Sequence, residues 1–447
     1  MMKKISLGWV SSVWVLGSML VTSNSFAQAA LPPPARPEAS PSPATPVVPG
    51  VAPTGEEPPE EIDFPSLSTA LASARERGPT VVVSRGALGV ARASRVGAGL
   101  IPIGNPYMEV VANQGTRGVT QDVSFSATMW LPLELWGQRR GRINEAEARA
   151  SWAGASSTVV RTAAASVAMQ AYGSAVVEAE RAKLLAQILE TARGEATLYQ
   201  ERMKAGDATA QDAALAAVEV ARNAVALAEC RADLQRALTD LARVMGVEVV
   251  HEPGATTTLR PPSTEWAEQN AGELAATSPS VNALQREANY LDRTRLRYAA
   301  EARLPVSLML ATGRGDLGEW RFGGGLAFTL PFLRSNQGEQ ALARAERDRA
   351  VAETSAQRRS TTAALKGLVR EHRQVAEALA EYDRSLEPAG QASLDAAIAM
   401  QKAGKGEFLR VLTARRDLAL LRTRRLDMIR REWTIASQLL GLTGRGI

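Results

Sequence analysis

Four short stretches of the chain alternate between apolar and polar residues, which is the pattern of a β-strand with one apolar face. They are predicted over residues 105–113, 119–132, 305–313 and 320–331. In the second and fourth stretches the apolar positions are Val123, Phe125, Ala127, Met129 and Leu131, and then Phe322, Gly324, Leu326, Phe328 and Leu330. Val306, Leu308 and Leu310 share a face of the third stretch, and Met108, Val110 and Ala112 a face of the first.

Each pair of strands leads directly into a long, charged, alanine-rich segment with the composition of a helix. The helices are predicted over 138–203 and 337–402, followed by shorter ones over 208–246 and 406–441 and preceded by others over 66–100 and 265–303, broken near Pro79 and Pro279. At 1.5 Å per residue the two long helices each extend about 100 Å. Helices of this length do not fit a compact globular domain.

Heptad spacing in the second half predicts coiled-coil packing of these helices. One seam consists of Leu365, Leu368, His372, Val375, Leu379, Tyr382 and Leu386. A second stripe runs from Val411 to Leu439 and is interrupted by Arg425 and Glu432. Narrow seams with abundant alanine suit a thin helical wall with polar surface on both sides.

The order of the elements occurs twice, which indicates a tandem duplication. Matching landmarks include Lys204-Ala205-Gly206 with Lys402-Ala403-Gly404, and Leu131-Pro132 with Leu330-Pro331. Their separation stays at roughly 195 to 200 residues. We therefore expect a first repeat over 63–247, a linker over 248–264 and a second repeat over 265–445.

The N-terminal segment predicts export. Lys3 and Lys4 precede an apolar run, and Ala27-Gln28-Ala29 has the small-x-small form of a signal peptidase site, so residues 1–29 are expected to be a signal peptide. Residues 30–62 are proline-rich and are expected to be a disordered linker. No cysteine lies near the cleavage site, so a lipid anchor is unsupported. The single cysteine, Cys230, excludes an internal disulfide, and we expect it to be buried.

Charge and motifs exclude several classes of function. The net charge of +5 comes from arginine and glutamate interspersed along helices, without the basic block and stacking aromatics of a nucleic-acid site. The two histidines, His251 and His372, form no ligand set with metal spacing, and no catalytic constellation is present. Gly313-Arg-Gly-Asp-Leu-Gly318 is followed by a strand, so we interpret it as a hairpin turn. We expect neither an enzyme nor a cofactor.

The strands have about the length that crosses a bilayer at a tilt. Two hairpins cannot close a barrel, and an open sheet edge is not tolerated in lipid. Either the strands lie outside a membrane, or several chains complete one barrel. Three chains would supply twelve strands.

Taken together, the duplicated helix-strand-strand-helix-helix order, the two strand-to-helix junctions and the paired Lys-Ala-Gly turns resemble the TolC-like outer-membrane efflux factors, over residues 64 to 445. The resemblance implies a mainly α homotrimer with a 12-stranded outer-membrane barrel, four strands per chain, continuous with a periplasmic α-helical tunnel. It implies a barrel-to-tunnel junction at Pro132 and Pro331, where proline can end the ladder. The predicted lipid-facing residues are Phe125, Ala127, Met129, Leu308, Phe328 and Leu330.

The segment Leu330-Pro-Phe-Leu-Arg-Ser-Asn-Gln-Gly338 is similar to the P-L-F-D-R-N-Q-G junction of the heavy-metal (Czc-type) branch, although its central residues are Leu-Arg-Ser. In the family, the turns at the far end of the tunnel form the aperture and meet a periplasmic adaptor. The resemblance therefore implies adaptor-docking tips at Lys204, Ala205, Gly206, Lys402, Ala403 and Gly404. Asp212 matches a frequent family aspartate, whereas Arg410 lies where the family has an acidic stretch. We expect Asp212 to pair with Arg410 or Lys405 as an aperture gate.

The sequence thus predicts a passive exit duct that works with an adaptor and an energised inner-membrane pump and exports metal cations or drugs. One alternative is the exit duct of a type I secretion system. An alternative of another class is a periplasmic coiled-coil structural protein.

Overall fold

The structure is a computed structural model, and it describes residues 61–101, 104–117, 120–254, 257–264, 270–315, 318–330, 333, 335–403, 405 and 407–445. The expected signal peptide (1–29) and nearly all of the expected linker (30–62) lie outside the described residues. Pro331 and Gly404 also lie outside them.

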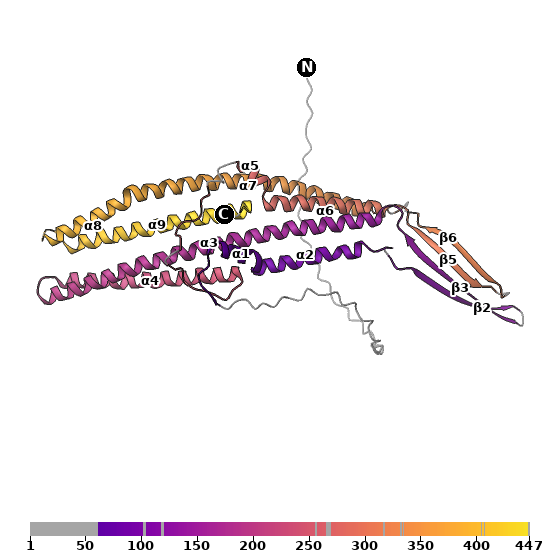
Figure 1. The fold of residues 1–447 in the computed structure, drawn as a ribbon, viewed down its shortest axis with the longest axis horizontal. Coiled ribbons are helices and arrows are strands. Elements are labelled where there is room, and N and C mark those ends of the chain that lie inside the picture. Colours follow the sequence, from indigo (N-terminus) through magenta and orange to yellow (C-terminus); the bar gives the residue numbers. More distant parts are fainter. Residues whose placement is uncertain are drawn as a thin grey trace, which may run out of the picture. The chain divides into compact units, whose positions relative to one another are not determined.

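The described chain is built from two sets of elements in the same order (Figure 1). The first set comprises α1 (Leu67–Arg77), α2 (Pro79–Ala98), β2 (Tyr107–Arg117), β3 (Thr120–Leu133), α3 (Gln138–Lys204) and α4 (Ala210–Met245). The second comprises α5 (Ala271–Ala276), α6 (Pro279–Glu301), β5 (Val306–Arg314), β6 (Trp320–Phe328), α7 (Gln337–Glu381), η2 (Tyr382–Leu386), α8 (Glu387–Lys402) and α9 (Phe408–Thr443). Two short strands, β1 (Glu61–Ile62) and β4 (Val249–Val250), pair in parallel.

The predicted helix breaks near Pro79 and Pro279 are confirmed. Each proline is the first residue of its helix, a position at which no helical N–H is needed. Ser278 caps α6, because its side chain accepts from the N–H of Val281.

The second long helix is not one continuous α-helix, which corrects the prediction over 337–402. α7 passes into the π-helical segment η2 before α8 begins. Pro388, within the first turn of α8, explains the wider turn, because proline lacks an N–H and clashes with the carbonyl four residues earlier. The extra residue rotates the helix face, so Leu386 is 43% exposed and does not belong to the buried seam.

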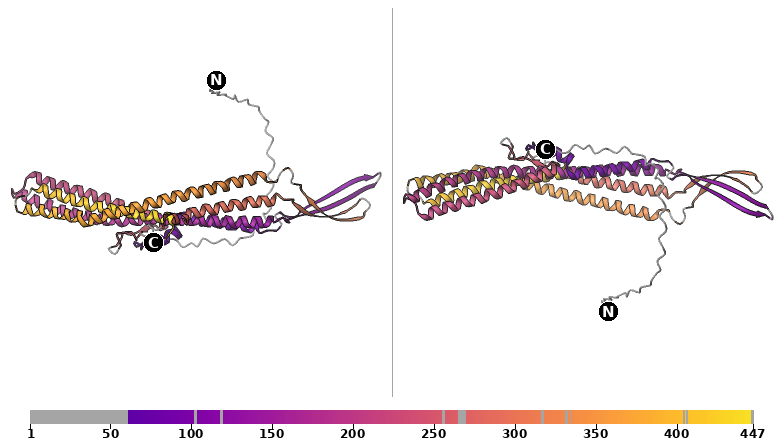
Figure 2. Two further views of the ribbon diagram at one scale, coloured as in Figure 1. Left: turned by 90° about the horizontal axis from the view of Figure 1, so that it is seen from above. Right: turned by 90° about the horizontal axis from the view of Figure 1, so that it is seen from below.

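The four long strands form one antiparallel sheet in the order β2-β3-β5-β6. The strands lie at one end of α2, α3, α6 and α7, and the turns between α3 and α4 and between α8 and α9 lie at the other (Figures 1 and 2). β5 and β6 pair as the predicted hairpin, and at its turn Gly318 has φ 81° and Gly315 N–H donates to the carbonyl of Glu319.

Two predicted strand ends were wrong, and the first is at Pro132. β3 continues to Leu133, and Pro132 lies opposite Ser307 within the ladder. The pairing of β3 with β2 has already ended at Trp130, so only one neighbouring strand remains at this position. A proline is tolerated where one side of the strand is unpaired.

The second correction concerns Leu330, which lies after the end of β6 and not within it. The last ladder pair is Val306 with Phe328, and Thr329 N–H donates to the carbonyl of Pro305 at 3.3 Å. Pro305 has no N–H with which to continue the ladder. Leu330 is 64% exposed, but its side chain is not fixed to a face of the sheet.

The main apolar core lies between the helices, where α1, α3, α4 and α9 meet. Trp433 of α9 is 1% exposed and packs near Tyr172 of α3, with ring centroids 5.7 Å apart. Cys230 is buried, as expected. No helix in the described part of the chain is both long and apolar enough to cross a membrane.

Candidate functional site: the sheet, the junctions and the tips

The register of the sheet brings the apolar positions of all four strands onto one face. Met129 lies opposite Met108 of β2 and Leu310 of β5, and Leu310 lies opposite Gly324 of β6. Directly opposite residues of antiparallel strands point to the same side. The predicted lipid-facing residues that lie on strands all belong to this face: Phe125, Ala127, Met129, Leu308 and Phe328.

This apolar face is exposed within one chain. Side chains more than half exposed on it include Met108, Val110, Phe322, Leu326 and Phe328. The other face carries hydroxyl groups and charges, with Ser126 opposite Gly313 and Gly313 opposite Arg321. An apolar outer band over a polar interior is the pattern of a strand from a membrane barrel.

Both outer strands of the sheet have a free edge. Within the described residues, β2 pairs only with β3, and β6 pairs only with β5. An unpaired edge exposes a row of N–H and C=O groups that must find partners in lipid. The sheet of one chain is therefore incomplete as a membrane structure.

The two strand-to-helix junctions share an unusual backbone turn. Gly137, which precedes α3, has φ 81°, and Asn336, which precedes α7, has φ 55°. Glycine and asparagine adopt this left-handed conformation at the least cost. The duplication therefore includes the conformation of the turn and not only the order of the elements.

The same hydrogen bond closes both turns. The side-chain oxygen of Gln138 accepts from the N–H of Trp136 at 2.9 Å. The side-chain oxygen of Gln337 accepts from the N–H of Ser335, also at 2.9 Å. In each repeat, the first helical glutamine thus fixes the direction in which the helix leaves the sheet.

A buried ion pair strengthens the first junction. Arg142 of α3 contacts Glu134 at 2.6 Å, and both side chains are less than 10% exposed. Arg142 also donates to the carbonyl of Leu100, between α2 and β2. The Arg142 guanidinium therefore connects the segment before β2 with the segment after β3. This contact holds the start of the polar helix α3 against the end of the apolar strand β3.

At the opposite end of the helices, the first turn is closed by local caps. α3 ends at Lys204, Ala205 is its C-cap, and Gly206 follows with φ 82°. Thr209 and Asp212 form a capping box at the start of α4. In the second turn, α8 ends at Lys402 with Ala403 as its C-cap.

The predicted gate residues make separate contacts within one chain. The carboxylate of Asp212 accepts from the N–H of Thr209 at 3.1 Å and from its hydroxyl at 2.7 Å. Arg410 contacts the sulfur of Met400 at 3.8 Å, and Lys405 N–H donates to the carbonyl of the same methionine. A pair between Asp212 and Arg410 or Lys405 across adjacent hairpins of the assembly stays a prediction.

An aromatic contact near the tips joins the hairpin of α3 and α4 to the hairpin of α8 and α9. The rings of Tyr199 on α3 and Phe408 on α9 have centroids 4.0 Å apart. Gln401 of α8 contacts the hydroxyl of Tyr199 at 2.5 Å, and Leu412 packs in the same cluster.

Ion pairs continue this connection along α9. Arg415 contacts Glu195 of α3, and Arg416 contacts Glu219 of α4, each at 2.5 Å. Burial raises the pKa of Glu195, and the charge of Arg415 opposes this shift. Further along, Arg430 contacts Glu178, which is 4% exposed.

The sequence analysis missed these pairs, because it treated arginine and glutamate only as charges interspersed along the helices. The partners belong to different repeats, and a helical period cannot reveal a contact across such a separation in sequence. The adjacent Arg415 and Arg416 were the one available signal.

A cavity of about 620 Å³ lies between the hairpins, lined by residues of α3, α4, α8 and α9. The charges on its wall include the paired Glu195, Glu219, Arg415 and Arg416. Among the described residues, no group of three or more His, Cys, Asp or Glu side chains is arranged to hold a metal ion.

Comparison with known proteins gives these features a context. A model of the outer membrane efflux protein family matches residues 68–247. The chain is 29% identical over 348 residues to the cobalt-zinc-cadmium resistance protein CzcC of Cupriavidus metallidurans, covering 77% of this chain and 82% of that protein. The chain is therefore similar to the outer membrane efflux protein family over its first repeat, and to CzcC over most of its length.

Solved structures show the same fold. A membrane protein from Pseudomonas aeruginosa superimposes with a TM-score of 0.69 at 18% identity, over 84% of this chain and 89% of that one. The outer membrane protein VceC of Vibrio cholerae gives a TM-score of 0.69 at 16% identity, over 85% and 97%.

These matches support an outer-membrane efflux channel with a periplasmic helical part. The expectation of an efflux channel is therefore confirmed, in preference to a periplasmic structural protein. Proteins of the family act together with an adaptor and an inner-membrane pump.

Proposed function

We propose that three copies of this chain form the exit duct of a tripartite system that expels divalent metal cations. The observation that carries the proposal is the sheet, because its apolar face is exposed and both of its edges are unpaired. Three copies provide twelve strands, so that β6 of one chain pairs with β2 of the next and no edge remains in lipid.

The duct is passive in this proposal. The sequence contains no nucleotide-binding motif, so the energy comes from the pump. The adaptor docks on the exposed turns that follow Lys204 and Lys402, at the ends of α3 and α8. Asp212 and the basic residues Lys405 and Arg410 lie close to these turns, so they belong to the aperture that the adaptor opens.

The substrate class rests on similarity. The relative from Cupriavidus metallidurans is named for resistance to cobalt, zinc and cadmium. The segment Leu330–Gly338 is also similar to the junction of the heavy-metal branch. We therefore assign divalent cations, which the solvated interior of a duct conducts without a binding pocket.

Metal tolerance tests this assignment. A strain lacking the gene is complemented with the parent chain or with a control carrying Gly194→Ala, a site where an added methyl meets no atom within 4 Å. We expect both to restore growth on cobalt, zinc and cadmium salts. Restoration of tolerance to lipophilic drugs alone would contradict the substrate class, while the trimeric duct would remain.

A further inference from the structure

A band of exposed apolar side chains lies at the level at which strands become helices. Its members come from three separate connections, namely Leu100 and Ile101 after α2, Leu135 and Trp136 after β3, and Leu330 and Leu333 after β6. Their exposed fractions run from 41% for Trp136 to 83% for Leu333. The band is continuous in sequence with the apolar strands, and it marks the periplasmic limit of the membrane-embedded sheet.

Just beyond the band, the exposed charges are positive. Arg139 and Arg140 lie in the first turn of α3, and Arg303 follows the last turn of α6. All three are exposed, and none forms an ion pair within the described residues.

Two acidic residues at the same level, Glu134 and Glu301, are paired within the chain. Glu134 is buried against Arg142 at 2.6 Å. Glu301 pairs with Arg297 at 3.3 Å, and its side chain is 22% exposed. The level therefore presents three exposed guanidinium groups without an acidic partner in the described chain, of which Arg139 donates to the carbonyl of Gly99 at 3.0 Å, while these two carboxylates are paired.

We propose that Arg139, Arg140 and Arg303 form a collar that binds the phosphate groups of anionic phospholipids in the periplasmic leaflet of the outer membrane. Trp136 and the neighbouring leucines occupy the boundary between headgroups and acyl chains, where amphipathic aromatic residues concentrate. Arginine extends from such a boundary to phosphate, with which it forms bidentate hydrogen bonds. Each basic side chain near an anionic membrane surface strengthens the electrostatic attraction between the protein and that surface.

This inference rests on the location of the strands in the outer membrane, not on the proposed substrate. A failed lipid test therefore leaves metal export untouched, and a failed metal test leaves the collar untouched. We assign the collar to the periplasmic leaflet, because it lies at the end of the sheet from which the helices extend.

The test uses the full chain purified in a neutral detergent at low salt. Phosphatidylglycerol or phosphatidylcholine is titrated in, and the temperature at which the assembly loses its native migration is measured. We expect phosphatidylglycerol to raise this temperature more than phosphatidylcholine does, and we expect high salt to abolish the difference. Equal effects of the two lipids on the parent protein would overturn the proposal without any variant.

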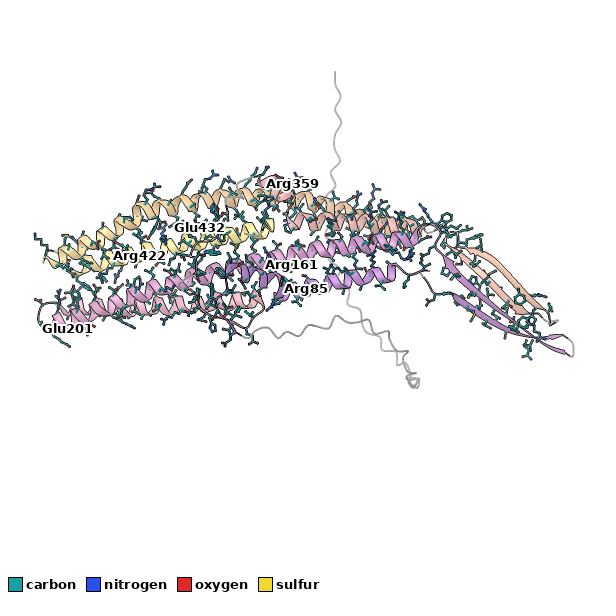
Figure 3. All side chains as sticks on the ribbon, viewed as in Figure 1. Arg85, Arg161, Glu201, Arg359, Arg422 and Glu432 are labelled. Carbon is teal, nitrogen blue, oxygen red and sulfur yellow. The ribbon has the colours of Figure 1, made fainter. Side chains whose placement is uncertain are left out.

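Two matched variants locate the site. In the collar variant Arg139→Gln/Arg140→Gln/Arg303→Gln, the phosphatidylglycerol concentration for half-maximal effect should rise on the order of tenfold or more, because three favourable charges are lost. The control Arg358→Gln/Arg359→Gln/Arg424→Gln removes the same charge from exposed positions of α7 and α9, of which Arg359 is labelled in Figure 3. It should respond like the parent.

Retention of the lipid preference in the collar variant would overturn the assignment. Loss of the preference in both triple variants would show a general charge effect and would overturn it as well. The same temperature is also measured with inorganic phosphate in place of lipid. Stabilisation by phosphate alone would indicate a site for free anions and would overturn the lipid assignment. If the triple variant does not assemble, the pair Arg139→Gln/Arg140→Gln carries the same comparison.

Discussion

The indole ring of Trp433 lies directly against the backbone of Gly173. A methyl group placed on Gly173 would be 2.4 Å from Cγ of Trp433, which is closer than atoms can approach without a shift. The ring nitrogen of Trp433 donates to the carbonyl of Leu259 at 2.9 Å, so the ring cannot easily turn away. Through this contact, α9 of the second repeat packs closely against α3 of the first.

Gly173→Ala should therefore destabilise the protein by about 1–3 kcal/mol, because the core at this point has no space for the added carbon. Gly194→Ala, on the same helix, meets no atom within 4 Å and should be neutral or stabilising by up to about 1 kcal/mol. Thermal unfolding of the two variants in detergent checks the prediction. Equal melting temperatures would mean that α9 does not depend on this contact.

The faces of the sheet give a second prediction. Phe125 lies on the apolar face and Ser124 on the other. Phe125→Arg should destabilise the barrel by up to roughly 2–4 kcal/mol, the cost of a charge at the membrane midplane, whereas Ser124→Arg should cost far less. The yield of assembled protein in outer-membrane fractions measures both. Similar yields would show that the assignment of the faces is wrong.

Much of this architecture could be predicted from the sequence, because alternation and heptads are local signals. The four strands, the first long helix and the breaks at Pro79 and Pro279 were all predicted. The apolar face was also predicted correctly, since residue alternation along a strand already decides which side chains share a side.

Features that depend on contacts between the repeats could not be predicted. The pairing of Glu195 with Arg415 joins α3 to α9, and the adjacent arginines of α9 do not indicate which glutamate they contact. The π-helical segment depends on the position of Pro388 within an otherwise strong helical pattern, which favoured an unbroken helix. Glu432 was interpreted as an interruption of a seam, yet it is 7% exposed and lies within that seam.

Glu432 provides a prediction about pH. Burial raises its pKa above the ordinary value of 4.5, while Arg260, His372 and Arg425 oppose the shift. The folded state therefore holds this proton to a higher pH than the unfolded state, and stability is lost as pH rises through the range above 4.5. Glu432→Gln, which cannot ionise, should melt above the parent at about pH 8, and the difference should shrink toward about pH 4.5.

Glu201 is the matched control, because it is an exposed glutamate near the tip of α3 (Figure 3). Glu201→Gln should leave the pH profile of the melting temperature unchanged. A constant difference between Glu432→Gln and the parent at every pH would mean that the ionisation of Glu432 does not affect stability.

The aperture gives a further prediction, and the structure sharpens its design. Asp212 also caps α4, so Asp212→Ala would remove the cap together with the charge. Asp212→Asn keeps a capping side chain and removes only the charge. We expect this variant to raise conductance in planar bilayers, because an exposed ion pair with Arg410 or Lys405 of a neighbouring chain contributes up to about 1 kcal/mol to closure.

Charge exchange completes that test. Asp212→Arg with Arg410→Asp should return the conductance to the low value of the parent. Asp207→Asn, in the same turn, serves as the control and should conduct like the parent. If all of these variants conducted alike, the constriction would be formed by other residues.

The number of chains in the assembled particle tests the account most directly. One chain contributes four strands with two free edges, so closure at twelve strands requires three chains. Native mass spectrometry of the protein extracted from outer membranes should give a particle of three chains. A particle of one or two chains would contradict the trimeric duct.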